Sequence, residues 1–335
     1  MTDSPQAIAV LGAGSWGTAL AIQFARTGRL TFLWGHDEGH LENLARDREN
    51  KKYLPGAPFP SALKIEGRLS RAIADARDVL IVVPSHGFRE MLKRLKPQLN
   101  PGARLCWATK GFELDTGKLP HEVVADVLGD AVQSAVLSGP TFANEVGLDL
   151  PTAMTIASTD EDYATDLADS ISTRNFRAYT TSDVIGVEVG AAVKNVLAIG
   201  AGISDGLGFG ANTRVALITR GLREMTRLGL ALGAQSETFM GLAGIGDLVL
   251  TCTDNQSRNR RMGLALARGD GIEAAQREIG QVVEGVHAAK SVWTVAQKLS
   301  VDMPISEQIY RILYENADPK TAVGALMERA LKAES

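Results

Sequence analysis

The apolar residues of the chain follow two different patterns, one in each half. Up to about residue 180, short runs of aliphatic and β-branched residues alternate with amphipathic stretches, which predicts strands covered by helices. From Thr181 onward the apolar residues recur at helical spacing over long segments. The pattern therefore predicts an α/β half followed by an all-helical half, with the boundary between residues 180 and 185.

The first apolar run, residues 8–11, ends in three glycines with the spacing G-x-G-x-x-G. We expect Gly12 to allow a tight turn, Gly14 to let a pyrophosphate approach the backbone, and Gly17 to let the next helix lie close to the strand. A helix-forming run and a second β-rich run at 30–34 complete a βαβ unit. The stretch therefore predicts a dinucleotide site at a helix N-terminus.

The end of the second β-rich run bears on which dinucleotide is preferred. An acidic residue there binds the ribose 2′-hydroxyl of NAD, whereas a basic one accommodates the 2′-phosphate of NADP. His36 stands nearest to that position and Asp37 follows it. A histidine tolerates both forms, so the choice between NADP(H) and NAD(H) stays open, and a solvated loop imidazole is the alternative for His36.

Three later apolar runs also predict strands, and each ends in residues that suit ligand binding. The runs at 78–83, 105–109 and 135–137 are continuous in aliphatic residues, as expected of parallel strands covered on both faces. They end at Pro84-Ser85, at Lys110-Gly111 and at Gly139-Pro140-Thr141. Ligands lie beyond the carboxyl ends of such strands, so we expect one crevice with Lys110 as its positive charge. The alternative for Lys110 is a solvated loop lysine.

The rest of the chain is expected to complete the sheet and then to form helices. Runs at 153–157 and 176–179 predict further strands, and the proline-rich stretch 53–61 predicts a surface loop. Helices are predicted at 184–203, 212–230, 258–268, 285–299 and 303–314. The first of these is long enough to span a membrane. Because it contains Glu188, Lys194 and several glycines, we expect a buried core helix and no membrane span.

Lys194 is the first candidate for chemistry, because it lies within an otherwise apolar helical segment. Lysines are almost never buried without a partner or a task. Burial favours the neutral amine, so such a lysine can exchange a proton near neutral pH. The alternatives are a side chain that reaches the surface and a structural ion pair.

A second group of candidates follows in the helical half. The stretch 241–248 predicts a glycine-rich turn that presents the carboxylate of Asp247. Ser257 suits a helix N-cap, and Arg258 behind it can bind a phosphate through two hydrogen bonds. We expect Arg260 and Arg261 to lie on a solvated face of that helix.

The composition is that of an ordinary globular protein and narrows the choice of partners. The 335 residues suffice for two domains, with 45% hydrophobic and 22% charged residues. A net charge of −4 and a pI near 5.8 give no general attraction to nucleic acid or anionic membranes. Cys106 and Cys252 lack disulfide or metal-ligand spacing, which predicts reduced thiols and a cytoplasmic protein. The five scattered histidines predict no metal site.

Taken together, these motifs resemble the NAD(P)-dependent glycerol-3-phosphate dehydrogenase family of the soluble bacterial type. The matching stretches are 12–21, 110–113, 137–143, 194–195, 241–247, 257–261 and 283–285. The resemblance implies reversible NAD(P)H-dependent reduction of dihydroxyacetone phosphate to sn-glycerol 3-phosphate, which feeds glycerophospholipid biosynthesis. It also implies an N-terminal Rossmann domain (residues 1–182) with a doubly wound, mostly parallel sheet. The C-terminal domain (residues 183–335) is expected to be all-helical and similar to that of 6-phosphogluconate dehydrogenase, and the protein to be a homodimer.

The resemblance also assigns roles to individual residues, with Lys194 as the catalytic proton donor and acceptor. Substrate contacts are expected at Lys110, Gly139, Thr141, Lys194, Asp247, Ser257, Arg258 and Asn259. Cofactor contacts are expected, besides the glycines Gly12, Gly14 and Gly17, at Ser15, Trp16, His36, Lys110, Ala143, Arg258, Val282 and Glu284.

Some positions depart from the family pattern, and two other functions fit part of the sequence. Thr141 stands where serine is common, and changes at 147–149 and at Asp254 leave the loop geometry near Glu145 and Asp254 open. A β-hydroxyacid dehydrogenase shares the two-domain plan and a helix lysine, but prefers a carboxylate substrate. A catalytically silent NAD(P) sensor would bind the cofactor without turnover.

Overall fold

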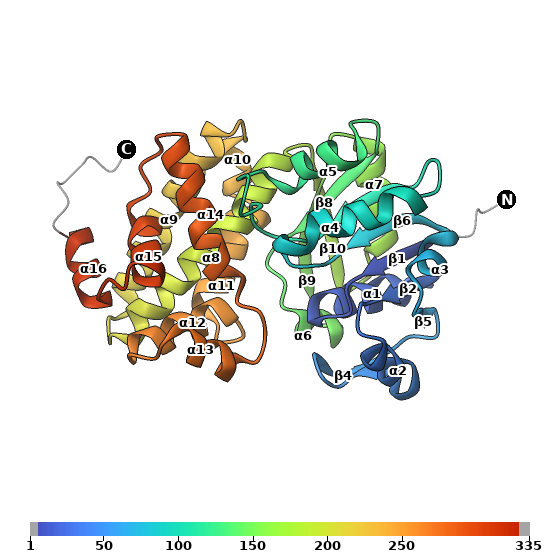
Figure 1. The fold of residues 1–335 in the computed structure, drawn as a ribbon, viewed down its shortest axis with the longest axis horizontal. Helices are drawn as coiled ribbons and strands as arrows, with labels where there is room; N and C mark the ends of the chain where they lie inside the picture. The colour runs from blue at the N-terminus through green and yellow to red at the C-terminus, as the bar shows by residue number, and fades with distance from the viewer. Residues whose placement is uncertain (1–5, 328–335) are drawn as a thin grey trace. The chain divides into compact units, whose positions relative to one another are not determined.

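The computed structural model describes residues 6–327, which divide into two compact units. Unit 1 comprises the residues up to 110 together with 118–188, and unit 2 comprises 111–117 and the residues from 189 onward. Within the described residues, all strands belong to unit 1 and unit 2 is helical (Figure 1). The change from an α/β half to a helical half is therefore confirmed.

Unit 1 alternates strands and helices along the chain. Its strands are β1 (Ala7–Leu11), β2 (Thr31–Trp34), β3 (Glu49–Asn50), β4 (Leu54–Pro58), β5 (Leu63–Ile65), β6 (Ala76–Ile81), β7 (Arg104–Trp107), β8 (Ser134–Ser138), β9 (Thr152–Ala157) and β10 (Phe176–Thr181). Its helices are α1 (Ser15–Arg26), α2 (Glu38–Asp47), α3 (Leu69–Ala74), α4 (Ser85–Leu95), the 3₁₀ turn η1 (Lys96–Gln98), α5 (Pro120–Leu128), α6 (Ala143–Gly147) and α7 (Glu161–Ile171).

Eight of these strands form one sheet in the order β10-β9-β8-β7-β6-β1-β2-β5. The strands from β8 to β5 are all parallel, β9 runs antiparallel to β8, and β10 is parallel to β9. The prediction of a mostly parallel, doubly wound sheet is confirmed. The chain builds outward in one direction from β1 and then in the other from β6, so the switch point of the sheet lies between these two strands.

Helices cover both faces of this sheet, as Figure 1 shows. Cys106 of β7 belongs to the core on the face covered by α1 and α7, where it packs with residues such as Phe24 and Leu167. The next residue, Trp107, points to the opposite face, and its ring meets Phe88 of α4 at 6.0 Å between centroids. Burial on both faces explains why these strands are apolar at consecutive positions.

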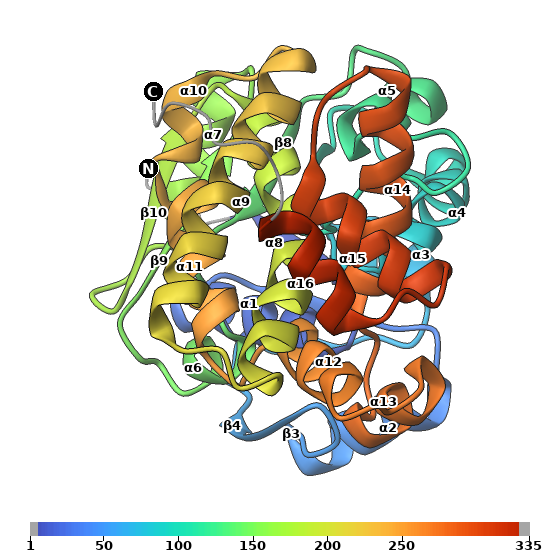
Figure 2. The same ribbon diagram turned by 90° about the vertical axis from the view of Figure 1, so that its left-hand side faces the viewer.

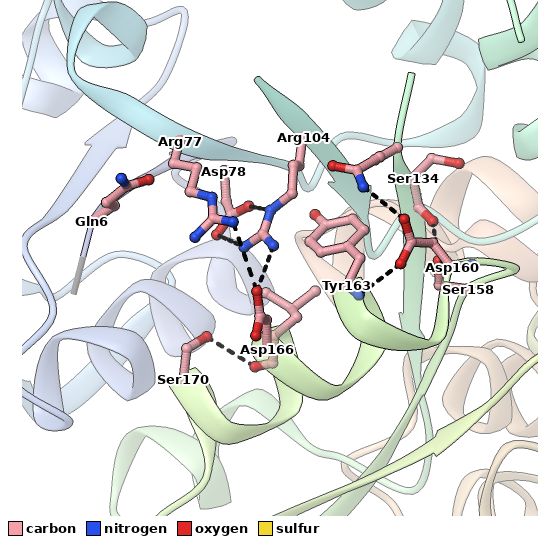
Figure 3. A network of polar contacts seen from close by, with 12 residues as sticks. Gln6, Arg77, Asp78, Arg104, Ser134, Ser158, Asp160, Tyr163, Asp166 and Ser170 are labelled. Atoms are coloured by element: carbon pink, nitrogen blue, oxygen red, sulfur yellow. Dashed lines mark hydrogen bonds and ion pairs between the residues drawn. The ribbon is translucent and has the colours of Figure 1, made fainter. Parts of the chain in front are cut away.

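A buried charged cluster crosses the amino ends of the central strands (Figure 3). Asp78 of β6 is fully buried and pairs with Arg29 and with Arg104 of β7, the latter at 2.7 Å. Arg104 also pairs with Asp166 of α7 at 2.8 Å. The cluster therefore ties the loop before β2, two strands and a helix together, at the edge opposite to the strand ends that the sequence marked for ligands.

Unit 2 is built from helices around α8 (Val184–Gly206), which begins within unit 1. The others are α9 (Ala211–Ala231), α10 (Ser236–Phe239), the π-helical turn η2 (Leu242–Gly246), α11 (Asp247–Thr253), α12 (Arg258–Ala267), α13 (Ile272–Ile279), α14 (Glu284–Lys298), α15 (Pro304–Tyr314) and α16 (Pro319–Met327). The five helices predicted here are confirmed. By length and hydropathy α8 could cross a membrane, but 89% of its most apolar 18-residue stretch is buried, as expected of a core helix.

Figure 2 shows α8 among the other helices of unit 2. Small residues let some of these helices approach α8 closely. A Cβ atom at Gly202 of α8 would lie 2.0 Å from the carbonyl oxygen of Arg260 in α12. A Cβ atom at Gly263 of α12 would lie 2.0 Å from the carbonyl oxygen of Ile199 in α8. The two backbones are therefore in direct contact, which fixes the start of α12 relative to the helix that carries Lys194.

Two local predictions were wrong. Residues 53–61 are not a plain loop, because β4 pairs with β3 in a two-stranded antiparallel ribbon. Leu54 and Ala57 of β4, and Phe59 directly after it, join the core of unit 1. The stretch 241–248 is not a simple turn but η2 followed directly by α11. Close packing shapes this stretch, since a Cβ atom at Gly190 of α8 would lie 2.5 Å from the carbonyl oxygen of Ala243, and a Cβ atom at Gly244 would lie 2.2 Å from the carbonyl oxygen of Phe239.

Candidate active site

The three glycines after β1 form the turn that their spacing predicts. Gly12 has a φ of +129°, and a Cβ atom there would lie 2.1 Å from the carbonyl oxygen of Val82. A Cβ atom at Gly17 would lie 1.8 Å from the carbonyl oxygen of Gly12, so only glycine lets α1 start this close to the strand. No heavy atom outside residues 13–15 lies within 4 Å of a Cβ built on Gly14, so the backbone there faces open space.

This turn fits the pyrophosphate of a dinucleotide. Gly14 is the N-cap of α1 and supplies no side chain to the free N–H groups of the first turn, which starts with Ser15 and Trp16. Among residues 6–327, Trp16 Nε1 is a buried donor without a hydrogen-bond partner. Ala143, another predicted cofactor contact, is the first residue of α6, which packs against α1. An anion at the start of α1 would satisfy groups that the protein leaves unpaired.

The residues at the end of β2 carry mixed charge. His36 is exposed, as the solvated-loop alternative also requires. Asp37 is the N-cap of α2, where its carboxylate accepts a hydrogen bond from the backbone N–H of His40 at 2.9 Å. That hydrogen bond lowers the pKa of Asp37, and the nearby charges of His40, Lys52 and His36 act in the same direction. The carboxylate predicted to follow the strand is thus already engaged by the helix.

Three predicted substrate residues follow the carboxyl ends of two neighbouring strands. Trp107 of β7 is paired with Val136 of β8, so Lys110 and Gly139 each stand three residues beyond this pair. Lys110 is half-buried, and Gly139 is buried with a φ of +143°. The hydroxyl of Thr141 donates to the carbonyl oxygen of Gly139 at 3.2 Å. The fold therefore places these three residues at one edge of the sheet, as expected.

In unit 2 the side chain of Lys194 is buried and has two partners. Only 6% of the residue is exposed, so it does not reach the surface. Its Nζ lies 2.6 Å from Oδ1 of Asp247 and 3.1 Å from Oγ1 of Thr251. Asp247, 1% exposed, is the first residue of α11, and Thr251 lies one turn later and donates to the Asp247 backbone oxygen at 2.6 Å. The amine thus forms the buried ion pair that was one of the alternatives.

The start of α12 collects the other predicted residues of the helical half. Ser257 is its N-cap and accepts from the backbone N–H of Arg260 at 3.2 Å, as predicted. Arg258 Nη1 donates to Gln281 Oε1 at 3.3 Å, directly before the exposed Val282. Asp254, which ends α11, accepts from the backbone N–H of Gln256 at 2.7 Å and so orders the loop into α12.

Asn259 joins three helices at this point. Its Nδ2 donates to Asn195 Oδ1 on α8 at 2.8 Å, and its Oδ1 accepts from the backbone N–H of Gly285 on α14 at 2.8 Å. Asn195 Nδ2 in turn lies 3.5 Å from Glu284 Oε2. The predicted residues therefore form two groups, one at the carboxyl edge of the sheet in unit 1 and one around α8 in unit 2.

One prediction about this region was wrong, and one participant was missed. Arg260 does not lie on a solvated face: it is 8% exposed and pairs with Asp205 at 2.5 Å, while a hydrogen bond joins it to Asn255. The backbone contact between α12 and α8 turns this side chain inward. Thr251 was missed because its spacing of four from Asp247 has meaning only on a helix, and the sequence predicted a turn.

Neither metal nor thiol chemistry is supported in the part of the chain that the structure describes. No group of three or more His, Cys, Asp or Glu side chains there is placed to hold a metal ion. Cys106 and Cys252 are buried and unpaired, as predicted, and burial raises the pKa of each thiol to about 12.

Comparisons with known proteins identify the family of the chain. Residues 7–164 match the model of the NAD-dependent glycerol-3-phosphate dehydrogenase N-terminus, and residues 183–324 match that of its C-terminus. The chain is 56% identical to glycerol-3-phosphate dehydrogenase (NAD(P)+) of Pseudoalteromonas translucida over 335 residues, the full length of both chains. It is also 56% identical to the Vibrio cholerae enzyme over 331 residues, 98% of this chain and 96% of that one.

Solved structures give the same result. The crystal structure of glycerol-3-phosphate dehydrogenase from Coxiella burnetii is 49% identical, with a TM-score of 0.94 over 97% of this chain and 99% of that one. A ketopantoate reductase from Ralstonia eutropha, 16% identical, has a TM-score of 0.60 over 95% of this chain and 99% of that one and shares only the fold. Since the two matched segments cover most of its length, the chain belongs to the NAD-dependent glycerol-3-phosphate dehydrogenase family.

Proposed function

We propose that this protein catalyses the reversible reduction of dihydroxyacetone phosphate to sn-glycerol 3-phosphate, with NADPH or NADH as the reductant. The observation that carries the proposal is the buried amine of Lys194, held by Asp247 and Thr251, in a chain of this family. A ketone that accepts a hydride becomes an alkoxide, so the reaction needs a proton donor. The names of the similar proteins support the substrate.

Lys194 is the proton donor in this proposal. The charge of Asp247 favours the ammonium form, whereas burial disfavours it, so the amine can release a proton when an alkoxide forms beside it. The ammonium also stabilises the negative charge that develops on the oxygen. Thr251 Oγ1 accepts from Lys194 Nζ at 3.1 Å and donates to the backbone oxygen of Asp247 at 2.6 Å, which helps to keep the amine and the carboxylate in one arrangement.

The start of α12 supplies the phosphate contacts. Arg258 can bind two phosphate oxygens, and the first turn of the helix adds N–H groups and a positive dipole. Ser257 and Asn259 complete this group, and Lys110, Gly139 and Thr141 are assigned to the substrate from unit 1. A phosphate held away from the reacting carbon lets binding energy orient the ketone.

The cofactor is assigned to the turn after β1. When bound, the nicotinamide supplies the hydride. Gly12 and Gly17 shape the turn, and Gly14, Ser15 and Trp16 present the start of α1 to the pyrophosphate. The remaining cofactor residues in the proposal are His36, Lys110, Ala143, Arg258, Val282 and Glu284.

The test follows the loss of nicotinamide absorbance with dihydroxyacetone phosphate, separately with NADPH and NADH. We expect turnover with the phosphorylated ketone, and none with a β-keto acid. Lys194→Met should lower kcat by roughly 10² to 10⁴, the usual loss for a missing general acid, while cofactor affinity stays within about twofold. Lys290→Met removes an exposed lysine of α14 and serves as the control. Near-normal turnover in Lys194→Met would remove this residue from the mechanism.

The proposal extends to the protein in its cell. Free, buried cysteines support a reducing cytoplasm, where the product feeds glycerophospholipid biosynthesis. Exposed apolar side chains at Leu230 and Met240 support a homodimer, which light scattering would test. The segments matched by the family models, ending at 164 and starting at 183, support domains at 1–182 and 183–335.

A further inference from the structure

A buried asparagine outside all the assigned residues contacts the glycine turn directly. Asn50, the second residue of β3, has no exposed surface. Its Nδ2 donates to the carbonyl oxygen of Ala13 at 3.2 Å and to the hydroxyl of Thr18 at 2.8 Å, while its Oδ1 accepts from the backbone N–H of Tyr53 at 3.1 Å. The side chain thus joins the β3–β4 ribbon to the turn and to the first part of α1.

The contact with Ala13 fixes the orientation of one peptide plane. The carbonyl of Ala13 and the N–H of Gly14 belong to the same planar trans peptide, so they point in opposite directions. When Asn50 holds the carbonyl oxygen on one side, the Gly14 N–H is aimed to the other. The residues on both sides of Ala13 are glycines, whose backbone freedom would otherwise allow this peptide to rotate.

A second group supports the same carbonyl. His40 of α2 has its Nε2 3.2 Å from the Ala13 oxygen, and its ring meets Tyr53 edge-on with 5.2 Å between centroids. In the tautomer with a proton on Nε2 it donates to this oxygen. Two side chains from two different elements, α2 and β3, therefore converge on one backbone oxygen of the turn.

We propose that Asn50 is a positioning residue for the cofactor: it holds the peptide after Ala13 so that the turn presents its N–H groups to the pyrophosphate before the cofactor arrives. The inference rests on the proposed function only in taking a nicotinamide dinucleotide as the ligand of the turn. The turn binds tightly because its amides need not reorganise, and the loss of Asn50 adds that reorganisation to binding.

The test measures NADPH binding directly, by calorimetry without substrate, together with unfolding in urea. Asn50→Asp keeps the size of the side chain and the acceptor for Tyr53, and the Thr18 hydroxyl can donate to it, but the donor to Ala13 is lost. We expect its Kd for NADPH to rise at least tenfold, with the KM for dihydroxyacetone phosphate within twofold of wild type at saturating NADPH. His40→Phe is the second variant and keeps the proposal testable if Asn50→Asp folds poorly. It keeps a ring against Tyr53 and should raise the Kd for NADPH about threefold.

Gln23→Ala is the matched control, because it also removes a buried amide that ties α1 to another element. Gln23 is 1% exposed, and its Nε2 donates to the carbonyl oxygen of Ile171 at 2.9 Å, away from the glycine turn. It should lose stability and keep its affinity for NADPH. Unchanged affinity in both Asn50→Asp and His40→Phe would overturn the proposal. Absent reduction of dihydroxyacetone phosphate by the wild type would instead refute the proposed function, and the binding test would still stand.

Discussion

Asp37 has less influence on cofactor choice than its position after β2 suggests. Its carboxylate is engaged as the N-cap of α2, and Lys52 places a positive charge near it. A ribose 2′-hydroxyl would compete with the helix for the carboxylate, whereas a 2′-phosphate would meet this positive charge. We therefore expect this position to favour NADPH.

Lys52 should contribute to that preference. We expect kcat/KM to be higher with NADPH than with NADH. Lys52→Ala should lower the ratio of these two kcat/KM values about fivefold, because one exposed charge contributes about 1 kcal/mol at close range. Steady-state assays with both cofactors at two salt concentrations test this, and added salt should weaken the effect. Lys51→Ala is the control, since Lys51 pairs with Asp47 at 3.1 Å. An unchanged ratio in Lys52→Ala would contradict the assignment.

The buried carboxylate of Glu224 should make the stability of unit 2 depend on pH. It accepts hydrogen bonds from the backbone N–H groups of Ile305, at 2.6 Å, and Ser306, at 3.1 Å, at the start of α15. Burial nevertheless raises the pKa of Glu224 from 4.5 to about 7. The folded protein thus holds this proton more tightly than the unfolded chain. The contribution of Glu224 to the free energy of unfolding is therefore largest below pH 4.5. It falls as the pH rises to about 7 and is constant above that pH.

Glu224→Gln removes this titration and keeps an acceptor for the backbone. Between pH 5 and pH 8 its unfolding free energy should fall less than that of the wild type, by on the order of 2 to 3 kcal/mol. Urea unfolding followed by circular dichroism at the two pH values measures the difference. Glu273→Gln changes an exposed carboxylate of α13 and should follow the wild type. If Glu224→Gln shows the same pH dependence as the wild type, burial does not control this group.

At the scale of the element, the start of α12 is held by contacts that do not involve Arg258. Ser257 caps the helix, Asn259 joins it to α8 and α14, and Arg260 pairs with Asp205. Arg258→Ala should therefore leave the helix in place and remove the proposed phosphate contact, together with the hydrogen bond to Gln281. We expect the KM for dihydroxyacetone phosphate to rise at least tenfold, with little change in melting temperature.

Steady-state kinetics and thermal unfolding of Arg258→Ala separate these effects. Arg268→Ala provides the control. Arg268 is the C-cap of the same helix and pairs with Asp270 and Glu278. A normal KM in Arg258→Ala would refute the phosphate role, and a matching rise in Arg268→Ala would make the effect unspecific.

The elements that the sequence predicted well are those with local determinants. The glycine spacing, the helix-forming run after it and the flanking β-rich runs all lie within residues 8–34, and each favours the same βαβ unit. The long helices were predicted because their apolar spacing repeats over several turns. Lys194 stood out for the same reason, since an amine interrupts an apolar pattern that continues on both sides.

The elements that escaped prediction depend on contacts distant in sequence. The β3–β4 ribbon exists because Leu54 and Ala57 reach the core of unit 1, and its prolines and glycine resemble a loop when taken alone. The position of η2 depends on Gly190, more than fifty residues earlier in the chain, because a Cβ atom there would lie 2.5 Å from the carbonyl oxygen of Ala243. Asn50 has no signal in the sequence, because a lone asparagine in a polar stretch shows its role only when Ala13 lies beside it.

At the scale of the whole molecule, the α/β unit places the buried Asp78–Arg104 cluster and the residues proposed to bind ligands at opposite edges of the sheet. Asp78 and Arg104 lie at the amino ends of β6 and β7, where Figure 3 shows them with Asp166. The glycine turn and Lys110 follow the carboxyl ends of β1 and β7. A change in the charged cluster should therefore affect stability without affecting ligand affinity.

Asp78→Asn tests this separation. The variant leaves Arg29 and Arg104, both buried, without their shared counter-charge, and should lower the unfolding free energy of unit 1 by about 3 to 5 kcal/mol. Asp126→Asn is the control, because its carboxylate is 36% exposed, and it should change the unfolding free energy by less than about 1 kcal/mol. Urea unfolding gives the stabilities, and assays below the melting range give the KM for each ligand. Because the cluster lies at the far edge of the sheet, the folded Asp78→Asn protein should keep both KM values, and a selective rise in either one would show that the two edges are coupled.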